Sequence, residues 1–140
     1  MIHITFLGTG TSQGIPIIAC KCNVCNSTDQ HDKRLRSSVY ISVQGVDFVI
    51  DAGPDFRQQM LRNSVENIDA VLLTHEHKDH TAGLDDIRPY NFIKNKAIDI
   101  FAEQRVIDSV RKEFSYVFAK NAYPGVPLME MHTITENAFE

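Results

Sequence analysis

Short apolar segments with the pattern of β-strands recur along the chain. Residues 2–7 alternate between apolar and polar positions, as a strand with one buried face does. Residues 68–73 are mostly apolar, which is typical of a strand buried on both faces, and residues 97–102 form a further strand. These segments predict a sheet.

Two more strands form a predicted hairpin. Residues 38–43 and 46–50 are rich in β-branched and aromatic side chains, and they flank Gln44 and Gly45. A polar residue followed by glycine suits the tight turn of a hairpin. We therefore expect these two strands to pair in antiparallel orientation.

Two segments have the spacing of helices. Residues 55–62 begin with Asp55, a residue favoured near helix N-termini, and place three apolar side chains on one face: Phe56, Met60 and Leu61. Residues 103–119 carry a longer apolar stripe, which should cover the sheet: Val106, Ile107, Val110, Phe114, Val117 and Phe118. Strands and helices together predict an α/β fold class.

The glycine-rich residues 8–14 follow the first predicted strand. A glycine loop that binds a nucleotide opens a helix, and no helical pattern follows here. We therefore favour a plain turn, in which the glycines let another segment approach closely, over a nucleotide-binding loop.

The composition excludes several classes of function. A chain of 140 residues that is 43% hydrophobic can form one domain with a core. The net charge of −4 and the pI near 5.8 argue against a broad basic surface, and so against long nucleic acid as a partner. No apolar run reaches the roughly 20 residues that cross a bilayer, and residues 1–4 lack the basic start of a signal peptide. We expect a cytoplasmic protein without a membrane partner.

The segment THEHKDH, residues 74–80, contains three of the six histidines of the chain, directly after a predicted strand. Neighbouring imidazoles repel one another when charged, so this density argues against an idle polar loop. In extended backbone His75 and His77 face the same way and can hold one ion. Asp79 and His80, beyond a bend, can reach a neighbouring position. The segment predicts two adjacent metal sites.

The ligand types indicate the metal and the reaction. Imidazole and carboxylate without thiolate suit Zn²⁺, with Fe or Mn as other occupants. Two such ions roughly 3.5–4 Å apart lower the pKa of a bridging water and polarise the bond under attack. The predicted chemistry is hydrolysis.

The His-x-His-x-Asp-His motif of residues 75–80, followed by Gly-Leu at 83–84, resembles the signature of the metallo-β-lactamase fold superfamily. Residues 48–53 resemble the Asp-x-Gly element that follows a hydrophobic strand in this superfamily. Residues 7–10 resemble the N-terminal loop of its phosphodiesterase-like members. The resemblance covers most of the chain.

This resemblance implies a role for each residue of the motif. His75 and His77 are implied to bind one metal ion, and Asp79 and His80 the other. Asp79 is also the implied catalytic residue, because it is placed to take part in proton transfer. Asp51 is implied to orient the loop by hydrogen bonds without binding an ion. The alternative for Asp51 is a cap on the following helix.

Residues 15–36 have a loop-like composition, and the segment is longer than a loop that merely connects two elements of a compact domain. Cys20, Cys22 and Cys25, the only cysteines of the chain, lie in this segment. Their spacing fits three thiolate ligands of one structural Zn²⁺ in a protein from a reducing compartment. Three unligated thiols are the alternative.

The cysteine segment resembles the branch of the superfamily that contains the cyclic phosphodiesterases of phosphonate breakdown. In that branch a structural zinc holds the corresponding segment, and a histidine far along the chain is the fourth ligand. His31, His132 or no residue of this chain can take that place here, and the sequence does not choose.

The superfamily fold is an αββα sandwich of two sheets with helices outside, each half giving one sheet. Its second half supplies a further His, a bridging carboxylate and a last His. Only His132 is available, and it reads equally well as part of a strand at 131–135. We therefore expect residues 1–140 to be the N-terminal portion of one domain, about half of the four-layer sandwich. An uncovered apolar sheet face predicts a truncated product, or pairing with another copy or the missing C-terminal half.

The resemblance implies a metal-dependent hydrolase, with a small-molecule phosphodiester as substrate and a metal-bound hydroxide between two divalent cations as nucleophile. Arg88 is a candidate phosphate contact, with a surface ion pair as the alternative. Other hydrolases of the superfamily, acting on tRNA 3′ ends, thioesters or lactams, remain alternatives. A non-catalytic zinc-bound half-domain that binds a partner is the alternative from another class.

Overall fold

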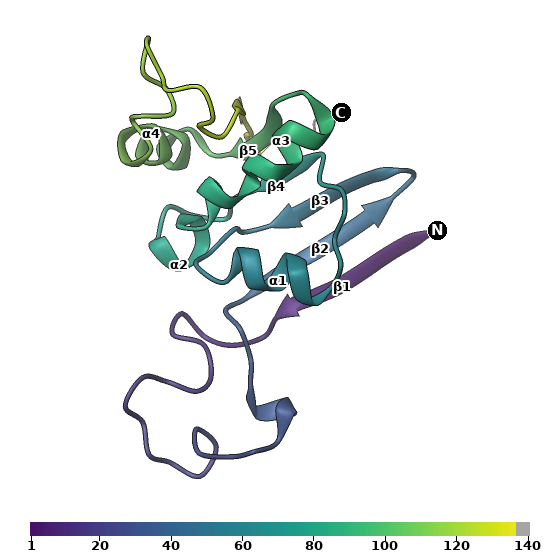
Figure 1. The fold of residues 1–140 in the computed structure, drawn as a ribbon, viewed down its shortest axis with the longest axis vertical. Helices are drawn as coiled ribbons and strands as arrows, with labels where there is room; N and C mark the ends of the chain where they lie inside the picture. Colours follow the sequence, from purple (N-terminus) through teal and green to yellow (C-terminus); the bar gives the residue numbers. More distant parts are fainter. Residues whose placement is uncertain (137–140) are drawn as a thin grey trace.

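A six-stranded mixed sheet runs through residues 1–136, the part of the chain that the computed structural model describes (Figure 1). The strands lie in sequence order: β1 (Ile2–Gly8), β2 (Ser38–Val43), β3 (Val46–Ile50), β4 (Ala70–Leu72), β5 (Ile98–Ala102) and β6 (Met129–Thr133). The first three strands pair antiparallel, and the pairs from β3 to β6 are parallel. The predicted α/β class and the predicted strands are confirmed, although β4 is shorter than residues 68–73.

The helices connect the strands and are short: η1 (Gln30–Asp32), α1 (Phe56–Arg62), α2 (Lys78–Thr81), η2 (Leu84–Ile87), α3 (Arg88–Lys94) and α4 (Gln104–Glu113). The prediction that α4 continues to residue 119 is wrong, because the helix ends at Glu113 and Phe114 is its C-cap. Ser, Tyr, Val and Phe follow, and all four are only moderate helix formers. Val117 and Phe118 still pack against the core from a turn.

The predicted hairpin is confirmed with its boundaries. Gln44 and Gly45 have φ of 53° and 83°, the left-handed conformation that two-residue hairpin turns require. The strands pair in register from Val43 opposite Val46 to Val39 opposite Ile50.

Helix α1 buries a different set of side chains from the one its pattern predicts. Phe56 and Met60 are buried as expected, but Leu61 is 62% exposed. Gln59 is buried in its place, and its Nε2 donates to the carbonyl oxygen of Arg36 at 2.8 Å. The buried side of the helix therefore includes a polar contact to the loop before β2.

The two faces of the sheet have different environments. Inward side chains such as Val49, Val71 and Ile100 are fully buried in one core with the helices. On the opposite face, Ile4 and Phe6 of β1 are 58% and 70% exposed. The structure therefore has the uncovered apolar sheet face that the sequence predicts.

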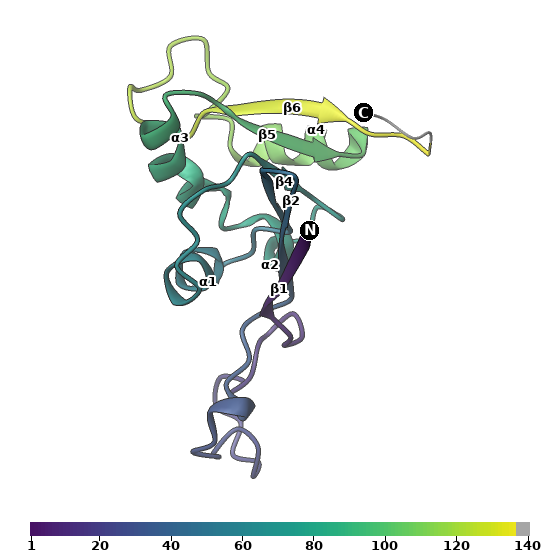
Figure 2. The same cartoon turned by 90° about the vertical axis from the view of Figure 1, so that its right-hand side faces the viewer.

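The glycine turn after β1 starts a long excursion. A Cβ at Gly8 would lie 2.0 Å from the carbonyl oxygen of Arg36, so the close approach predicted for this turn is confirmed. The segment between β1 and β2, residues 9–37, is named the cysteine loop below. It projects from one end of the sheet as a separate lobe in both views (Figures 1 and 2).

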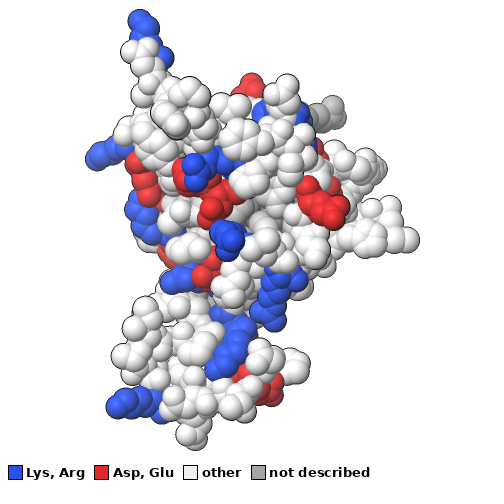
Figure 3. All heavy atoms as spheres, viewed as in Figure 1, with Lys and Arg blue, Asp and Glu red and all other residues white. Residues whose placement is uncertain are grey.

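The surface carries charges of both signs. Figure 3 shows Lys and Arg side chains interspersed with Asp and Glu side chains over one face of the molecule. Within residues 1–136, no helix has the length and apolar character needed to cross a membrane.

Candidate metal centres

The segment at residues 74–83, named the histidine loop below, leaves the sheet at the carboxyl end of β4. The backbone of Leu73 still donates to the carbonyl oxygen of Phe101 at 2.9 Å, so the loop starts from a fixed strand. His77 has extended backbone, with φ −66° and ψ 150°, and α2 begins at the next residue. Extended backbone at His77 followed by a helical turn is the bend that the sequence predicts.

Asp51, at the end of β3, is the anchor of the histidine loop. Its carboxylate accepts hydrogen bonds from the backbone N–H of Thr74 at 2.8 Å and from the Thr74 hydroxyl at 2.8 and 3.0 Å. The same carboxylate lies 2.7 Å from Nδ1 of His80. Asp51 is 5% exposed, so these bonds form in a dry environment where they are strong.

The alternative that Asp51 caps helix α1 has no support in the structure. The N-cap position is Asp55, which makes no side-chain cap bond. The Asp55 carboxylate instead accepts from the backbone and guanidinium of Arg36, both at 2.9 Å. Asp51 has a φ of 62°, a left-handed conformation that Asp tolerates better than most residues. This conformation turns the chain directly after β3.

Backbone contacts clamp the histidine loop against the residues after Asp51. Ala52 donates to the carbonyl oxygen of His80 at 2.8 Å and accepts from the backbone of Gly83 at 2.8 Å. A Cβ at Gly53 would lie 2.0 Å from the carbonyl oxygen of Asp79. A Cβ at Gly83 would lie 2.1 Å from the carbonyl oxygen of Gly53. Both glycines are therefore required by the close approach of the two segments.

The structure brings together the four predicted ligands of the histidine loop. The ring centroids of His75 and His77 are 4.7 Å apart, and those of His75 and His80 are 3.9 Å apart. Nε2 of His80 lies 3.1 Å from the carboxylate of Asp79. Their assignment to two separate ions stays a prediction.

Imidazole and carboxylate, the donor types of this loop, are ligands that Zn²⁺ accepts. Nδ1 of His80 faces the Asp51 carboxylate and so carries the proton of the neutral ring. The lone pair of that ring is then on Nε2, the nitrogen on the side of Asp79. A carboxylate that fixes the tautomer of a metal-binding histidine in this way is typical of zinc sites.

Several contacts of the histidine loop were not predicted. Nothing in the sequence around Thr74 indicates that its side chain has a partner 23 positions away. Glu76 lies 2.5 Å from Arg105 of α4, and Lys78 pairs with Glu113 of the same helix. These ion pairs join the outer side of the loop to α4.

Arg88, the candidate phosphate contact, forms a surface ion pair. Its guanidinium lies 2.8 Å from the carboxylate of Asp85, with 43% of the Arg88 side chain exposed. The structure therefore agrees with the alternative interpretation of Arg88.

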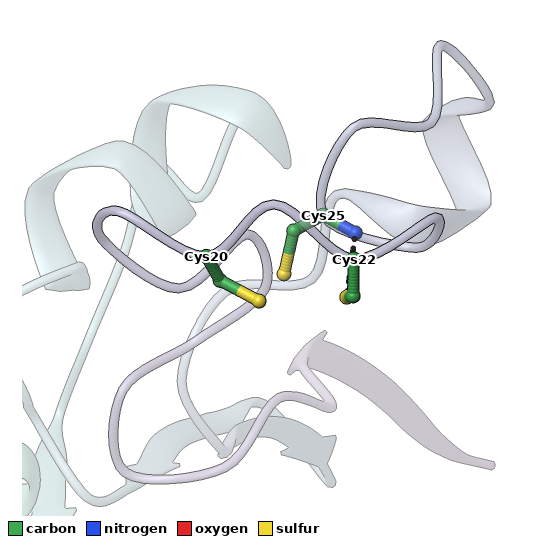
Figure 4. Close-up of side chains that lie close together, drawn as sticks. All are labelled: Cys20, Cys22 and Cys25. Carbon is green, nitrogen blue, oxygen red and sulfur yellow. Dashed lines mark hydrogen bonds between the residues drawn. The ribbon is translucent and has the colours of Figure 1, made fainter.

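The sulfur atoms of Cys20, Cys22 and Cys25 point toward one another (Figure 4). All three lie within 4.8 Å of one another, and none forms a disulfide. The backbone N–H of Cys25 donates to Sγ of Cys22 at 3.5 Å. This bond, together with hydrogen bonds to the thiols of Cys20 and Cys25, lowers the pKa of the Cys22 thiol to about 7. Thiolates at such spacing fit a closed zinc site.

Neither histidine considered as the fourth ligand joins the cysteine group within residues 1–136. His31 lies in the same loop, but its side chain is 96% exposed and contacts Asp29 at 2.8 Å. His132 lies on β6, at the opposite end of the molecule from the cysteine loop (Figures 1 and 2). Its Nε2 lies 2.7 Å from the carboxylate of Asp99. The strand interpretation of His132 is confirmed.

A mixed sheet with a carboxylate-anchored His-x-His-x-Asp-His loop at its carboxyl edge is the arrangement expected for one half of the metallo-β-lactamase fold. The family model described as the beta-lactamase superfamily domain matches residues 47–140. The chain belongs to this family.

Among curated proteins, an octanoyltransferase of Porphyromonas gingivalis is 50% identical over 126 residues, covering 89% of this chain and 25% of that protein. The coenzyme PQQ synthesis protein B of Methylobacterium radiotolerans is 33% identical over 125 residues, covering 76% of this chain and 42% of that protein. The chain therefore spans less than half the length of these two relatives.

Two solved structures share the fold over nearly the whole chain. A diphosphatase from the PhnP family has a TM-score of 0.87 and 40% identity, covering 100% of this chain and 53% of that chain. Zinc-bound PqqB from Methylobacterium extorquens has a TM-score of 0.72 and 27% identity, covering 97% of this chain and 47% of that chain.

Proposed function

We propose that the protein is a metal-dependent hydrolase that cleaves a phosphorus–oxygen bond, with a small phosphodiester as its substrate. The observation that carries this proposal is the grouping of His75, His77, Asp79 and His80 in one loop, with the His80 ring held by the buried carboxylate of Asp51. The likeness to a diphosphatase at 40% identity supports phosphorus chemistry over lactam or thioester chemistry. Because that likeness covers about half of the diphosphatase, the substrate class is part of the proposal.

Each side chain receives a role in this proposal. His75 and His77 hold one cation, and Asp79 and His80 hold a second. When bound, such cations supply Lewis acidity and a water that is nucleophilic near neutral pH. Asp51 keeps the His80 ring in the required tautomer. Asp79 also accepts a proton during the reaction, since its carboxylate is the one acidic group among the four ligands.

The test is hydrolysis of bis-p-nitrophenyl phosphate by purified protein. We expect turnover that a chelator abolishes and that Zn²⁺ or Mn²⁺ restores. Asp79→Ala should abolish turnover, while Asp108→Ala, on the exposed side of α4, should leave it unchanged. A substituted diphosphate assayed in parallel tells whether the preferred substrate is an ester or an anhydride. Turnover that survives both chelation and Asp79→Ala would refute the proposal.

A second candidate is a zinc-bound half-domain that binds a partner without catalysis. The observation in its favour is the exposed apolar face of the sheet, on which the side chains of Ile4 and Phe6 are exposed to solvent. Metal binding without turnover, together with self-association or capture of the C-terminal part of the domain, would favour this candidate. The group of free thiols fits a reducing compartment, and for either candidate we propose the cytoplasm.

A further inference from the structure

Three potential metal ligands meet on the open face of the sheet, and none of them belongs to the histidine loop or the cysteine loop. Asp99 on β5 and Glu130 on β6 are directly paired positions of neighbouring parallel strands. His132 lies two residues after Glu130 and so shares its face. One ligand atom from each of the three side chains lies within 4.8 Å of those of the other two.

The sheet holds these side chains in place. The neighbouring inward residues are Ile100, which is fully buried, and Met131, which packs against the core. The ring of His132 also stacks on Phe101, with centroids 4.8 Å apart and planes 21° apart. Ligands fixed on strands and held by packing are better organised for an ion than ligands on a loop.

The charge balance at this position favours a cation. Like charges directly opposite each other on neighbouring strands are destabilising, and Asp99 faces Glu130 in this way. Nε2 of His132 lies 2.7 Å from the Asp99 carboxylate, so the imidazole already faces the paired acidic side chains. Asp99 and His132 are 37% and 35% exposed, which leaves access for an ion and its waters.

We propose that Asp99, Glu130 and His132 form a further metal site, distinct from the histidine and cysteine loops, that binds a divalent cation of the zinc class. One imidazole and two carboxylates are ligands that Zn²⁺ and Mn²⁺ accept. When metal–ligand bonds are about 2.0–2.2 Å long, two ligand atoms on one ion lie about 3.3 Å apart. The ligand atoms of His132 and Asp99 therefore need to move apart only slightly to bind the same ion. Because its ligands come from both strands, the ion links strand β6 to strand β5.

The structural role follows from the position of β6. This strand has one neighbour, β5, within residues 1–136, and it follows residues 114–128, which contain no helix or strand. An ion bound by residues 99, 130 and 132 therefore closes this long connection and resists fraying of the edge.

The test is zinc stoichiometry measured by elemental analysis after loading and gel filtration. We expect His132→Ala to bind one zinc fewer per chain than the unmodified protein, and His3→Ala, an exposed histidine on β1, to bind the same number. Co²⁺ loading separates the sites, because only the thiolate site gives sulfur-to-metal absorption. That absorption should be unchanged in His132→Ala.

Glu130→Gln tests the same proposal without disturbing the stacked ring. Glu130 is exposed, so its amide keeps the shape and fold. We expect zinc affinity at this site to fall by about tenfold or more, and the zinc-dependent rise in Tm to shrink. Unchanged stoichiometry in His132→Ala, or unchanged affinity in Glu130→Gln, would show that the three residues form an ion pair and not a metal site.

Discussion

The histidine loop and the cysteine loop each gather potential metal ligands in a short segment, yet the protein holds them in opposite ways. The histidine loop lies against the sheet, tied to Asp51 and pressed against Gly53. The cysteine loop leaves the sheet as a lobe, and Cys25 is its one buried hydrophobic residue. Its base is fastened by the ion pair of Arg36 with Asp55.

This difference distinguishes the roles that we propose for a metal at the two loops. The fold organises the histidine loop through hydrogen bonds and close packing, so an ion there can serve chemistry. The cysteine loop buries too little apolar surface to offset the entropy of ordering its chain. We infer that an ion at its thiolates serves structure, because a cross-link replaces the missing core.

Metal removal should separate the two loops most strongly. Structural zinc sites contribute about 10 kcal/mol or more to folding in small domains, so chelation should release the cysteine loop. We expect trypsin to cut at Lys21 and Lys33 about 100-fold faster after chelation, with a change of less than about threefold at Lys78 in the histidine loop. Mass spectrometry of timed digests measures the three sites in one sample. Equal acceleration at all three would remove the distinction between the loops.

Gly53→Ala disturbs the packing of the histidine loop without changing any proposed metal ligand. The added methyl meets the carbonyl oxygen of Asp79 at 2.0 Å, so the loop must move. We expect the free energy of unfolding to fall by about 3 kcal/mol in urea titrations, with cobalt–thiolate absorption at the cysteines retained. Gly45→Asn is the matched control, since Gly45 has open space and asparagine tolerates its positive φ. Equal losses in the two variants would contradict the close-packing argument.

Asp51→Asn weakens the histidine loop through its ligands. The amide keeps the shape but cannot accept from both Thr74 and His80 as a carboxylate does. Metal affinity at the histidine loop should fall about 10- to 100-fold, measured by competition with a chromogenic chelator. The cysteine site should keep its affinity, and Asp108→Asn should change neither. A loss shared by both sites would indicate general unfolding instead.

Thr74→Val removes one hydroxyl from the anchor and should have the smallest effect. Its side chain gives up the bonds to Asp51, while the backbone bond remains. We expect a loss of about 1 kcal/mol in the free energy of unfolding, and recovery of most of it in Thr74→Ser. Equal stability of the valine and serine variants would mean that the hydroxyl is dispensable.

Local patterns predicted much of the fold because they report interactions between near neighbours in sequence. Alternation in residues 2–7 and the Gln44–Gly45 turn gave correct strands and a correct hairpin. The density of histidines in residues 74–80 identified the segment that folds into the candidate centre. The exposure of Leu61 was mispredicted, because the helical pattern contains no information on the contact between Gln59 and Arg36.

By itself the sequence determined the strands, the hairpin and the kinds of ligand present, since period-two alternation and ligand chemistry are properties of short segments. Only the tertiary structure decided that Asp51 supports the histidine loop across 23 and 29 positions, and that Asp99 meets His132 across 33. Strand register and backbone packing determine which of these distant residues come into contact. Distances of this kind depend on how the whole sheet is assembled, which no single segment encodes.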